Sequence, residues 1–370
     1  MTQLTSIVPA WSELVTDPFD PHLQILTETL AALDGPADQS GLWPEAIWSA
    51  LSAQHVSRWA LPVEVGGEAC DRIRLLQRYA RVAEGSLAAA FILTQHDAGV
   101  RRLVTAITRA PAHAWLEMIA ADEAFSTVGI SQLTTSNRLG PQALKAVPDR
   151  HHGYRLDGMM PWVTAAEMAD VIITGAVLAD GRQLLIALPT DRPGLEVREP
   201  FPLAALQASC TSEVICQAVH VEERFLLAGP TNDVIAQPGA TGTGGLETSA
   251  LALGLARAAI KSIEAEAPQR ASLLEPVEAL AESWRDAWKS LHAAALGAPH
   301  ALTSVQVRTQ ANNLALRATQ AYLTVRKGSG FLRTDPAQRW ARQALFFLVW
   351  SCPTPVAQTA IRDLAGLCET

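Results

Sequence analysis

The sequence predicts a mainly α-helical protein with a central β-domain, and three observations support this. The chain has 370 residues, more than one hydrophobic core usually serves, so several packed units are expected. Apolar residues recur at three- and four-residue spacing in both outer parts of the chain. The middle part instead carries short alternating or β-branched runs. We therefore expect a helical domain over 1–120, a β-domain over 121–232 and a four-helix bundle over 233–370.

The N-terminal part is predicted to be helical because its apolar residues form stripes. One such stripe consists of Ile73, Leu76, Tyr79, Ala80 and Ala83. Residues 61–67, LPVEVGG, contain proline and paired glycines, which break helices. We expect a loop there, between two helices.

The β-domain is predicted from five runs that begin with FSTVGISQL at Phe125 and end with EVICQAVHV. Gly, Asp and Pro residues separate these runs, as is typical of turns between strands. After Gly239 the helical spacing returns in four long segments with short connections, which is the pattern of a helix bundle. The segments are 248–267, 276–295, 304–325 and 337–350.

Composition excludes several functional classes. The net charge of −8, without a long Lys/Arg run, argues against a nucleic-acid partner. The five cysteines are scattered and never spaced as CxxC, and the His151-His152 pair lacks a partner at ligand spacing, so no metal site is expected. No signal peptide or apolar stretch of bilayer length is present, so we expect a cytoplasmic protein without a membrane span.

The segment from Gly158 to Ala166, GMMPWVTAA, followed by Ala169 and Asp170, resembles the G-x-K-x-W-I-T-N-x string of the acyl-CoA dehydrogenase superfamily. The resemblance covers nearly the whole chain. It implies an N-terminal helical domain, a middle β-barrel and a C-terminal four-helix bundle, with a flavin between the last two. FAD is the expected cofactor and FMN the alternative. Trp162 would pack on the flavin ring and Thr164 would bond its reactive edge.

Residues 125–146 resemble the flavin-binding T-E-P-x-x-G-S-D loop of that superfamily and the strand after it. Ser131 stands at the hydroxyl position of the T-E pair, Gln132 replaces the Glu, and Asn137 replaces the Ser. The resemblance implies that these three side chains bond the flavin. As an alternative, Gln132 and Asn137 are turn residues that satisfy the backbone.

The C-terminal half carries weaker similarities. Gly328 and Gly330 lie in a segment similar to the family's G-G-x-G-Y string, and Arg339 and Arg342 match its E-R-x-x-R-D string. Arg270 stands where the family's Arg reaches the dinucleotide of a neighbouring subunit, so a homodimer or homotetramer is expected. For Arg339 and Arg342 the alternative is a solvated helix face or salt bridges.

The catalytic base of the dehydrogenases is the main departure. Those enzymes use a Glu to remove the α-proton of an acyl thioester, and Ser351 occupies its usual place here. Some relatives carry the Glu on the first bundle helix, where Glu247 is the nearest carboxylate. As an alternative, Glu247 is an acidic residue favoured by the helix dipole.

A monooxygenase branch of the superfamily has no need of the Glu and relies on a His near the flavin. His96, in the segment from Thr94 to Asp97 at the end of the apolar helix LAAAFIL, is the candidate, with an ordinary pKa near 6.5. The alternative is a helix-terminal His bonded to backbone carbonyls. Three functions thus stay open: a dehydrogenase with a displaced base acting on a small molecule, first an acyl-CoA; a hydroxylase; and a catalytically degenerate relative.

Overall fold

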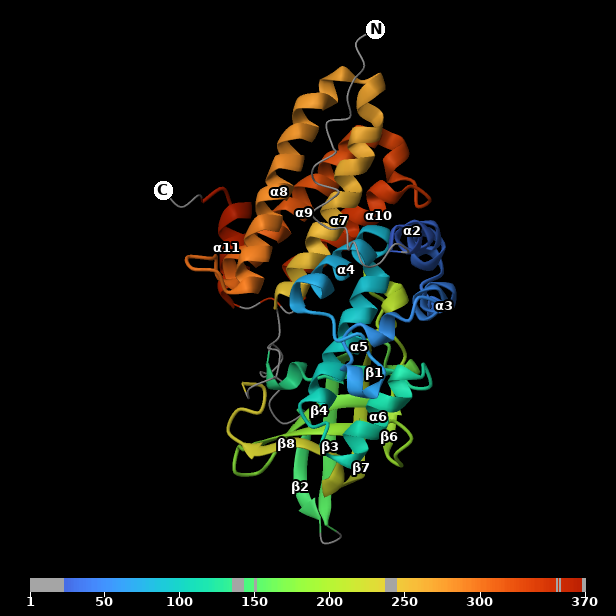
Figure 1. Ribbon diagram of the computed structural model, residues 1–370, viewed down its shortest axis with the longest axis vertical. Coiled ribbons are helices and arrows are strands. Elements are labelled where there is room, and N and C mark those ends of the chain that lie inside the picture. Colours follow the sequence, from blue (N-terminus) through green and yellow to red (C-terminus); the bar gives the residue numbers. More distant parts are fainter. Residues whose placement is uncertain are drawn as a thin grey trace.

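The computed structural model describes residues 23–134, 143–149, 152–236, 245–350, 352 and 354–367. Helices come first along the chain, strands follow, and helices close it, as the sequence predicts (Figure 1). The molecule is elongated, with the C-terminal helices at one end and the sheet at the other. No helix in the described part of the chain is long and apolar enough to cross a bilayer.

The N-terminal helices are α2 (Leu23–Ser40), α3 (Glu45–Ser52), α4 (Arg72–Gly85), α5 (Leu87–Val104) and α6 (Ala110–Ala120). The predicted loop at 61–67 contains only a short 3-10 helix, Val63–Val65. Asp71 caps α4, and Ser86 caps α5 by accepting a hydrogen bond from the Ala89 backbone N–H at 3.2 Å.

Helix α5 is longer than the sequence analysis expects, which corrects the placement of His96 at a helix end. The helix runs through the polar segment 94–97 to Val104, because Val100 and Leu103 continue its buried apolar stripe. The polar residues of that segment find tertiary partners instead of ending the helix. His96 is therefore a mid-helix residue.

The middle region is one eight-stranded mixed sheet. Its strands are β1 (Ser126–Gly129), β2 (Lys145–Asp149), β3 (Gly153–Val163), β4 (Val171–Val177), β5 (Gln183–Pro189), β6 (Leu195–Val197), β7 (Ser212–Glu222) and β8 (Leu226–Thr231). The order is β6-β7-β3-β2-β4-β5-β8, and β1 pairs in parallel with β4. Strand β1 also lies against α5, which joins the sheet to the helices.

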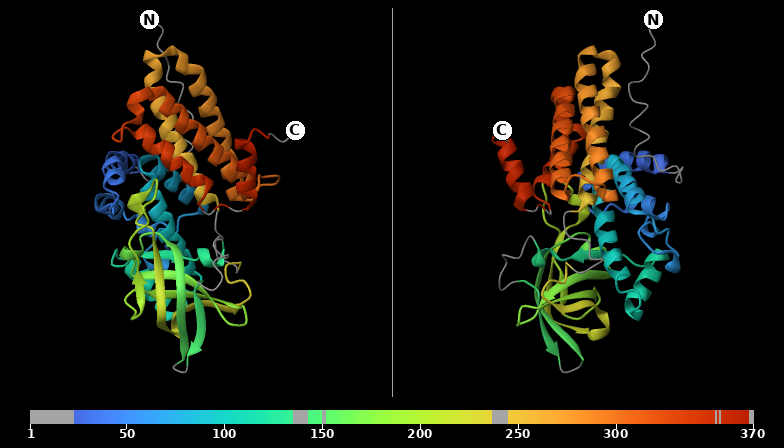
Figure 2. Two further views of the ribbon diagram at one scale, coloured as in Figure 1. Left: turned by 180° about the vertical axis from the view of Figure 1, so that it is seen from behind. Right: turned by 60° about the vertical axis from the view of Figure 1, so that its left-hand side comes forward.

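The C-terminal helices are α7 (Leu246–Glu266), α8 (Leu274–Leu296), α9 (Ser304–Arg326), α10 (Pro336–Leu345) and α11 (Thr354–Leu364). Helix α7 is central, since it packs on α4, α8 and α9 (Figure 2). A Cβ atom on Gly254 would lie 2.3 Å from the backbone oxygen of Ala80, so a side chain there would separate α7 from α4. The N-terminal and C-terminal helices share one hydrophobic core.

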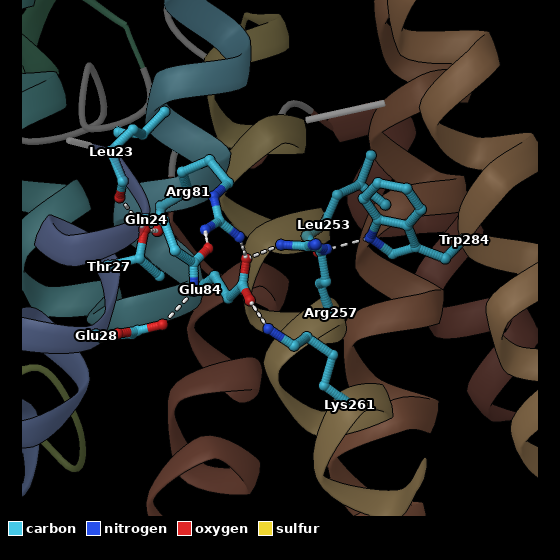
Figure 3. Close-up of polar contacts among 10 residues, drawn as sticks. All are labelled: Leu23, Gln24, Thr27, Glu28, Arg81, Glu84, Leu253, Arg257, Lys261 and Trp284. Carbon is cyan, nitrogen blue, oxygen red and sulfur yellow. Dashed lines mark hydrogen bonds and ion pairs between the residues drawn. The ribbon is translucent and has the colours of Figure 1, made fainter. Parts of the chain in front are cut away.

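A buried charge cluster also joins α4 to α7 (Figure 3). Glu84 of α4 accepts hydrogen bonds from Arg81 of the same helix and from Arg257 and Lys261 of α7, the last at 2.9 Å. Burial raises the pKa of Glu84, but the three cations, Arg257 foremost, lower it by more than burial raises it. The pKa of Glu84 therefore lies below its ordinary value. One carboxylate therefore binds three cations, two of which lie across the junction on α7.

Candidate functional site

A cavity of about 650 Å³ lies where α5 passes from the bundle to the sheet. Its walls come from the middle of α5, the segment after β1, the end of β3, the loop before β7, the start of α7 and the end of α10 with the turn that follows. The polar lining consists of Thr94, Gln95, Arg101, Arg102, Ser131, Thr134, Trp162, Thr164, Thr211, Glu247, Thr248 and Arg342.

Three of the residues expected to hold a flavin line this cavity. Trp162 is half exposed and its indole packs against Phe201, with ring centroids 4.7 Å apart. The Thr164 hydroxyl lies 3.3 Å from that of Thr211. The Ser131 hydroxyl oxygen is buried and has no hydrogen-bond partner among the residues that the structure describes.

These three side chains suit an isoalloxazine ring. A flat, largely apolar ring with polar edges needs an aromatic wall and a few well-placed hydrogen-bonding groups. Trp162 provides the aromatic surface for the ring, and the hydroxyls of Thr164 and Ser131 provide the polar groups. A buried hydroxyl without a partner costs free energy unless a bound group satisfies it, so Ser131 favours an occupied cavity.

Glu247 also faces the cavity, and it carries the one carboxylate among the described lining residues. It lies in the first turn of α7, where the positive end of the helix dipole favours an acidic side chain. Its Oε1 atom lies 3.7 Å from Nη2 of Arg101, and both side chains are one-fifth exposed. The cavity thus combines a carboxylate with the residues expected to hold a flavin.

An aromatic wall that the sequence analysis missed completes the apolar lining. Phe91 of α5 contacts Phe346 and Trp350, which follow α10, at centroid distances of 4.9 and 4.8 Å. The rings of Phe346 and Trp350 are stacked, with 13° between their planes. Phe91 is far from the other two in sequence, so no local pattern could bring them together.

The structure also places two unpredicted buried polar residues behind Arg101. The Tyr79 hydroxyl donates to Asp97 Oδ2 at 2.5 Å, and Arg101 Nη1 donates to the Tyr79 oxygen at 3.2 Å. Tyr79 and Asp97 are fully buried. Burial raises the pKa of Asp97 to about 7, although Tyr79 and Arg101 partly offset it. The four-residue spacing of Asp97 and Arg101 is the only sequence signal for this group.

His96 lies outside the cavity lining, between Trp48 and Phe125. Its Nδ1 lies 3.2 Å from the Ser126 backbone oxygen and 3.3 Å from the Ser126 backbone nitrogen. Burial lowers the pKa of His96 to about 4. The value near 6.5 expected from the sequence is therefore wrong, because this imidazole is shielded from water. The ring is neutral near pH 7.

Gln132 is buried and is not among the residues that line the cavity. Its Nε2 donates to the backbone oxygens of Gly129 and Gly175, at 3.0 and 2.8 Å, and to the Thr174 hydroxyl at 3.2 Å. These contacts agree with the alternative in which Gln132 satisfies the backbone of a turn. Ser131, its neighbour, is the residue of this pair that lines the cavity.

Arg270, Gly328 and Gly330 do not line the cavity. Arg270 lies beyond the far end of α7, roughly 30 Å from Glu247 along the helix. It donates to Glu266 and to the Val325 backbone oxygen, both at 2.9 Å. Gly328 and Gly330 belong to the short 3-10 helix after α9. Asn137 and Ser351 lie outside the residues that the structure describes.

Comparison with curated proteins identifies two relatives with related names. The chain is 25% identical over 336 residues to a probable acyl-CoA dehydrogenase, YngJ, of Bacillus subtilis, which covers 83% of this chain and 86% of the relative. It is 26% identical over 221 residues to benzylmalonyl-CoA dehydrogenase of Aromatoleum aromaticum, covering 53% of this chain and 56% of that protein. No protein-family model matches the chain.

Solved structures show the same fold. Butyryl-CoA dehydrogenase from Megasphaera elsdenii superposes with a TM-score of 0.81 at 17% identity, covering 95% of this chain and 99% of that one. FMN-bound TdsC from Paenibacillus sp. A11-2 superposes with a TM-score of 0.80 at 16% identity, covering 93% and 95%. The chain is thus similar in sequence to a probable acyl-CoA dehydrogenase and has the fold of butyryl-CoA dehydrogenase.

Proposed function

We propose that this chain is a flavin-dependent oxidoreductase that removes hydrogen from the α and β carbons of an acyl thioester or a similar substrate. The observation that carries the proposal is the shared cavity. Glu247, its one carboxylate among the described lining residues, lies there with Ser131, Trp162 and Thr164. A dehydrogenation of this kind needs a base beside a hydride acceptor, and this is the pairing that these residues suit.

Each residue has a defined task in this proposal. A bound flavin would supply the hydride acceptor. Trp162 would supply an apolar wall for it, and Thr164 and Ser131 would hydrogen-bond its edge. Glu247 removes the α-proton, and Arg101, 3.7 Å away, holds its carboxylate in place. In the sequence resemblance Ser351 replaces the family's usual base, so we assign the proton-accepting role to Glu247.

The same proposal includes FAD as the cofactor and a homo-oligomer as the working form. FAD is preferred to FMN because, by the family resemblance, Arg270 would contact the adenylate part of the cofactor, which FMN lacks. Arg270 lies about a whole helix length from the cavity of its own chain. A contact between Arg270 and a dinucleotide therefore requires a second copy of the chain, which makes a homodimer or homotetramer part of the proposal.

A reduced-flavin-dependent monooxygenase is the second candidate, and the aromatic wall favours it. Phe91, Phe346 and Trp350 suit a planar aromatic substrate, and a hydroxylation needs no carboxylate base. His96 is not placed to exchange protons with a cavity ligand, since it is not among the residues that line the cavity and burial lowers its pKa to about 4. This weakens the His96 route and leaves Glu247 as the better-placed proton acceptor.

The proposal is tested with purified protein loaded with FAD. Under anaerobic conditions, one member of an acyl-CoA panel should bleach the flavin absorbance. Glu247→Gln should retain the flavin and lose bleaching at least a hundredfold. Glu264→Gln, on the same helix but outside the cavity lining, is the matched control and should bleach normally.

Three results would contradict the proposal. Bleaching that survives Glu247→Gln would show that Glu247 is not the base. Failure of every thioester, together with oxygen-dependent conversion of an aromatic compound by the reduced protein, would favour the monooxygenase. Protein that binds neither FAD nor FMN in calorimetry would leave the catalytically degenerate relative.

A further inference from the structure

Four polar side chains form a continuous chain from the buried core to the cavity. Asp97 of α5 accepts from the hydroxyl of Tyr79 of α4 at 2.5 Å. The Tyr79 oxygen in turn accepts from Arg101 Nη1 at 3.2 Å. Nη2 of the same guanidinium lies 3.7 Å from Glu247 Oε1, at the start of α7. The proposed base is thus connected to a second carboxyl that no substrate can reach.

The second carboxyl is poorly compensated for a buried acid. Both Tyr79 and Asp97 are fully buried, and Asp97 Oδ1 has no hydrogen-bond partner in the described part of the chain. The titratable groups that face Asp97 are Tyr79 from α4, Glu247 from α7 and Arg101 from its own helix. Arg102, the next residue, interacts with Arg101 and Glu247. A carboxyl with one hydrogen bond in such a place gains and loses its proton far more easily near neutrality than an exposed one.

We propose that Asp97 is a positioning residue whose gain or loss of a proton, transmitted through Tyr79 and Arg101, changes how firmly Arg101 holds Glu247. The inference rests on the proposed function, in which Glu247 is the base. Burial raises the pKa of Asp97 to about 7, which puts this change within the range in which an enzyme commonly works.

Elementary electrostatics gives the direction of the effect. When Asp97 is protonated, it carries no charge, and of these two carboxyls Glu247 alone attracts the Arg101 guanidinium. When Asp97 is ionised, its negative charge attracts the same guanidinium from the other side and repels the Glu247 carboxylate. The hold of Arg101 on Glu247 is then weaker, so above pH 7 the carboxylate is freer to accept the α-proton of the substrate. Since the coupling is reciprocal, removing the charge of Glu247 must also change the titration of Asp97.

The titration can be measured without any substrate. Infrared spectroscopy of the full-length protein between pH 5 and pH 9 detects the carbonyl band of protonated carboxyls. The wild-type protein should show a band that titrates with a midpoint near 7, and Asp97→Asn should lack it. Glu264→Gln, which removes another carboxyl with a raised pKa, is the matched control and should keep it.

Two further variants test the coupling itself. Glu247→Gln should lower the midpoint by about half a pH unit or more, because it removes a negative charge that raises the pKa of Asp97. Tyr79→Phe should raise the midpoint, because the lost hydrogen bond stabilises the ionised carboxylate. Absence of an Asp97-dependent band, or a midpoint that Glu247→Gln leaves unmoved, would overturn the inference.

A last measurement separates this inference from the proposed function. If a thioester bleaches the flavin, the wild-type rate should rise through pH 7 and the rate of Asp97→Asn should lack that step. Identical pH profiles would overturn the inference while the dehydrogenase stands. If no thioester bleaches the flavin and Glu247→Gln still moves the Asp97 midpoint, the electrostatic coupling stands and the dehydrogenase fails.

Discussion

Arg339 of α10 forms a buried ion pair with Asp34 of α2, with 2.6 Å between Nε and Oδ2. One turn further along both helices, Arg342 pairs with Asp38 at the same distance. The first pair is almost wholly buried, whereas the Arg342 side chain is about one-third exposed. The two arginines that resemble the family's R-x-x-R string therefore connect α10 to α2, in agreement with the salt-bridge alternative.

Removing Arg339 should destabilise the protein more than removing Arg342. Arg339→Gln leaves the Asp34 carboxylate buried without its cation, so we expect a loss of about 3–5 kcal/mol in the free energy of unfolding. Arg342→Gln should cost about 1 kcal/mol or less, because water reaches that pair. Denaturant unfolding measures both, and equal losses would contradict the burial argument. Adding Asp34→Asn to Arg339→Gln should recover part of the loss.

The Glu84 cluster leads to a second stability prediction. Glu84→Gln leaves the buried guanidiniums of Arg81 and Arg257 without this carboxylate, so the free energy of unfolding should fall by about 3–5 kcal/mol. Glu266→Gln is the matched control. Glu266 also pairs with two arginines, Arg270 and Arg326, but in a more exposed place. Its removal should cost about 1 kcal/mol, and a larger cost than that of Glu84→Gln would refute the prediction.

The order of helices and strands could be predicted from the sequence because each element carries its own periodicity. The length of α5 could not, since polar residues within a helix resemble a helix end until their tertiary partners are known. Contacts such as Arg339 with Asp34 join residues some three hundred positions apart, and no local pattern specifies them. In the candidate site, the resemblance led to Ser131, Trp162, Thr164 and Glu247, which the fold brings to one cavity.

The parts of the site that the sequence did not reveal are those made by packing. Tyr79 lies on an apolar stripe and reads as a core residue, yet its hydroxyl binds Asp97. The sequence suggests that His96 carries protons, because histidine side chains ordinarily titrate near neutrality. Burial lowers the pKa of this imidazole to about 4 and so removes that property. In both cases the environment of the side chain decides its chemistry, and the environment is set by helices distant in sequence.

His96 gives a prediction for the pH dependence of stability. Its pKa is lowered from 6.5 to about 4 on folding, so the unfolded chain binds more protons in that range. The contribution of His96 to the free energy of unfolding is complete above pH 6.5. It decreases as the pH is lowered, and about 3 kcal/mol is lost at pH 4. His96→Gln should remove this part of the loss in unfolding experiments from pH 7 to pH 4. Asp97 acts in the opposite direction, so the slopes of the variant and the wild type are compared in the same buffers.

A slope that is unchanged in His96→Gln would show that the imidazole takes up a proton as readily in the folded protein as in the unfolded chain. It would then have to lie in a more open environment than the one between Trp48 and Phe125.

The neighbouring residues Ser131 and Gln132 should respond in opposite ways, and this pair tests the flavin site most directly. The Ser131 hydroxyl lines the cavity, is buried and has no hydrogen-bond partner among the described residues. Ser131→Ala should therefore leave the unfolding midpoint of flavin-free protein unchanged or slightly raised. It should weaken flavin binding by about tenfold, because the loss of one hydrogen bond of roughly 1.4 kcal/mol lowers the affinity by that factor. Gln132 makes three hydrogen bonds that close the turn after β1, so Gln132→Ala should lower that midpoint strongly. Calorimetric titration with FAD and with FMN, beside thermal unfolding of both variants, measures these effects. Flavin affinity that Ser131→Ala leaves intact would remove Ser131 from the cofactor site, because a buried hydroxyl that faces a bound flavin cannot be deleted without cost.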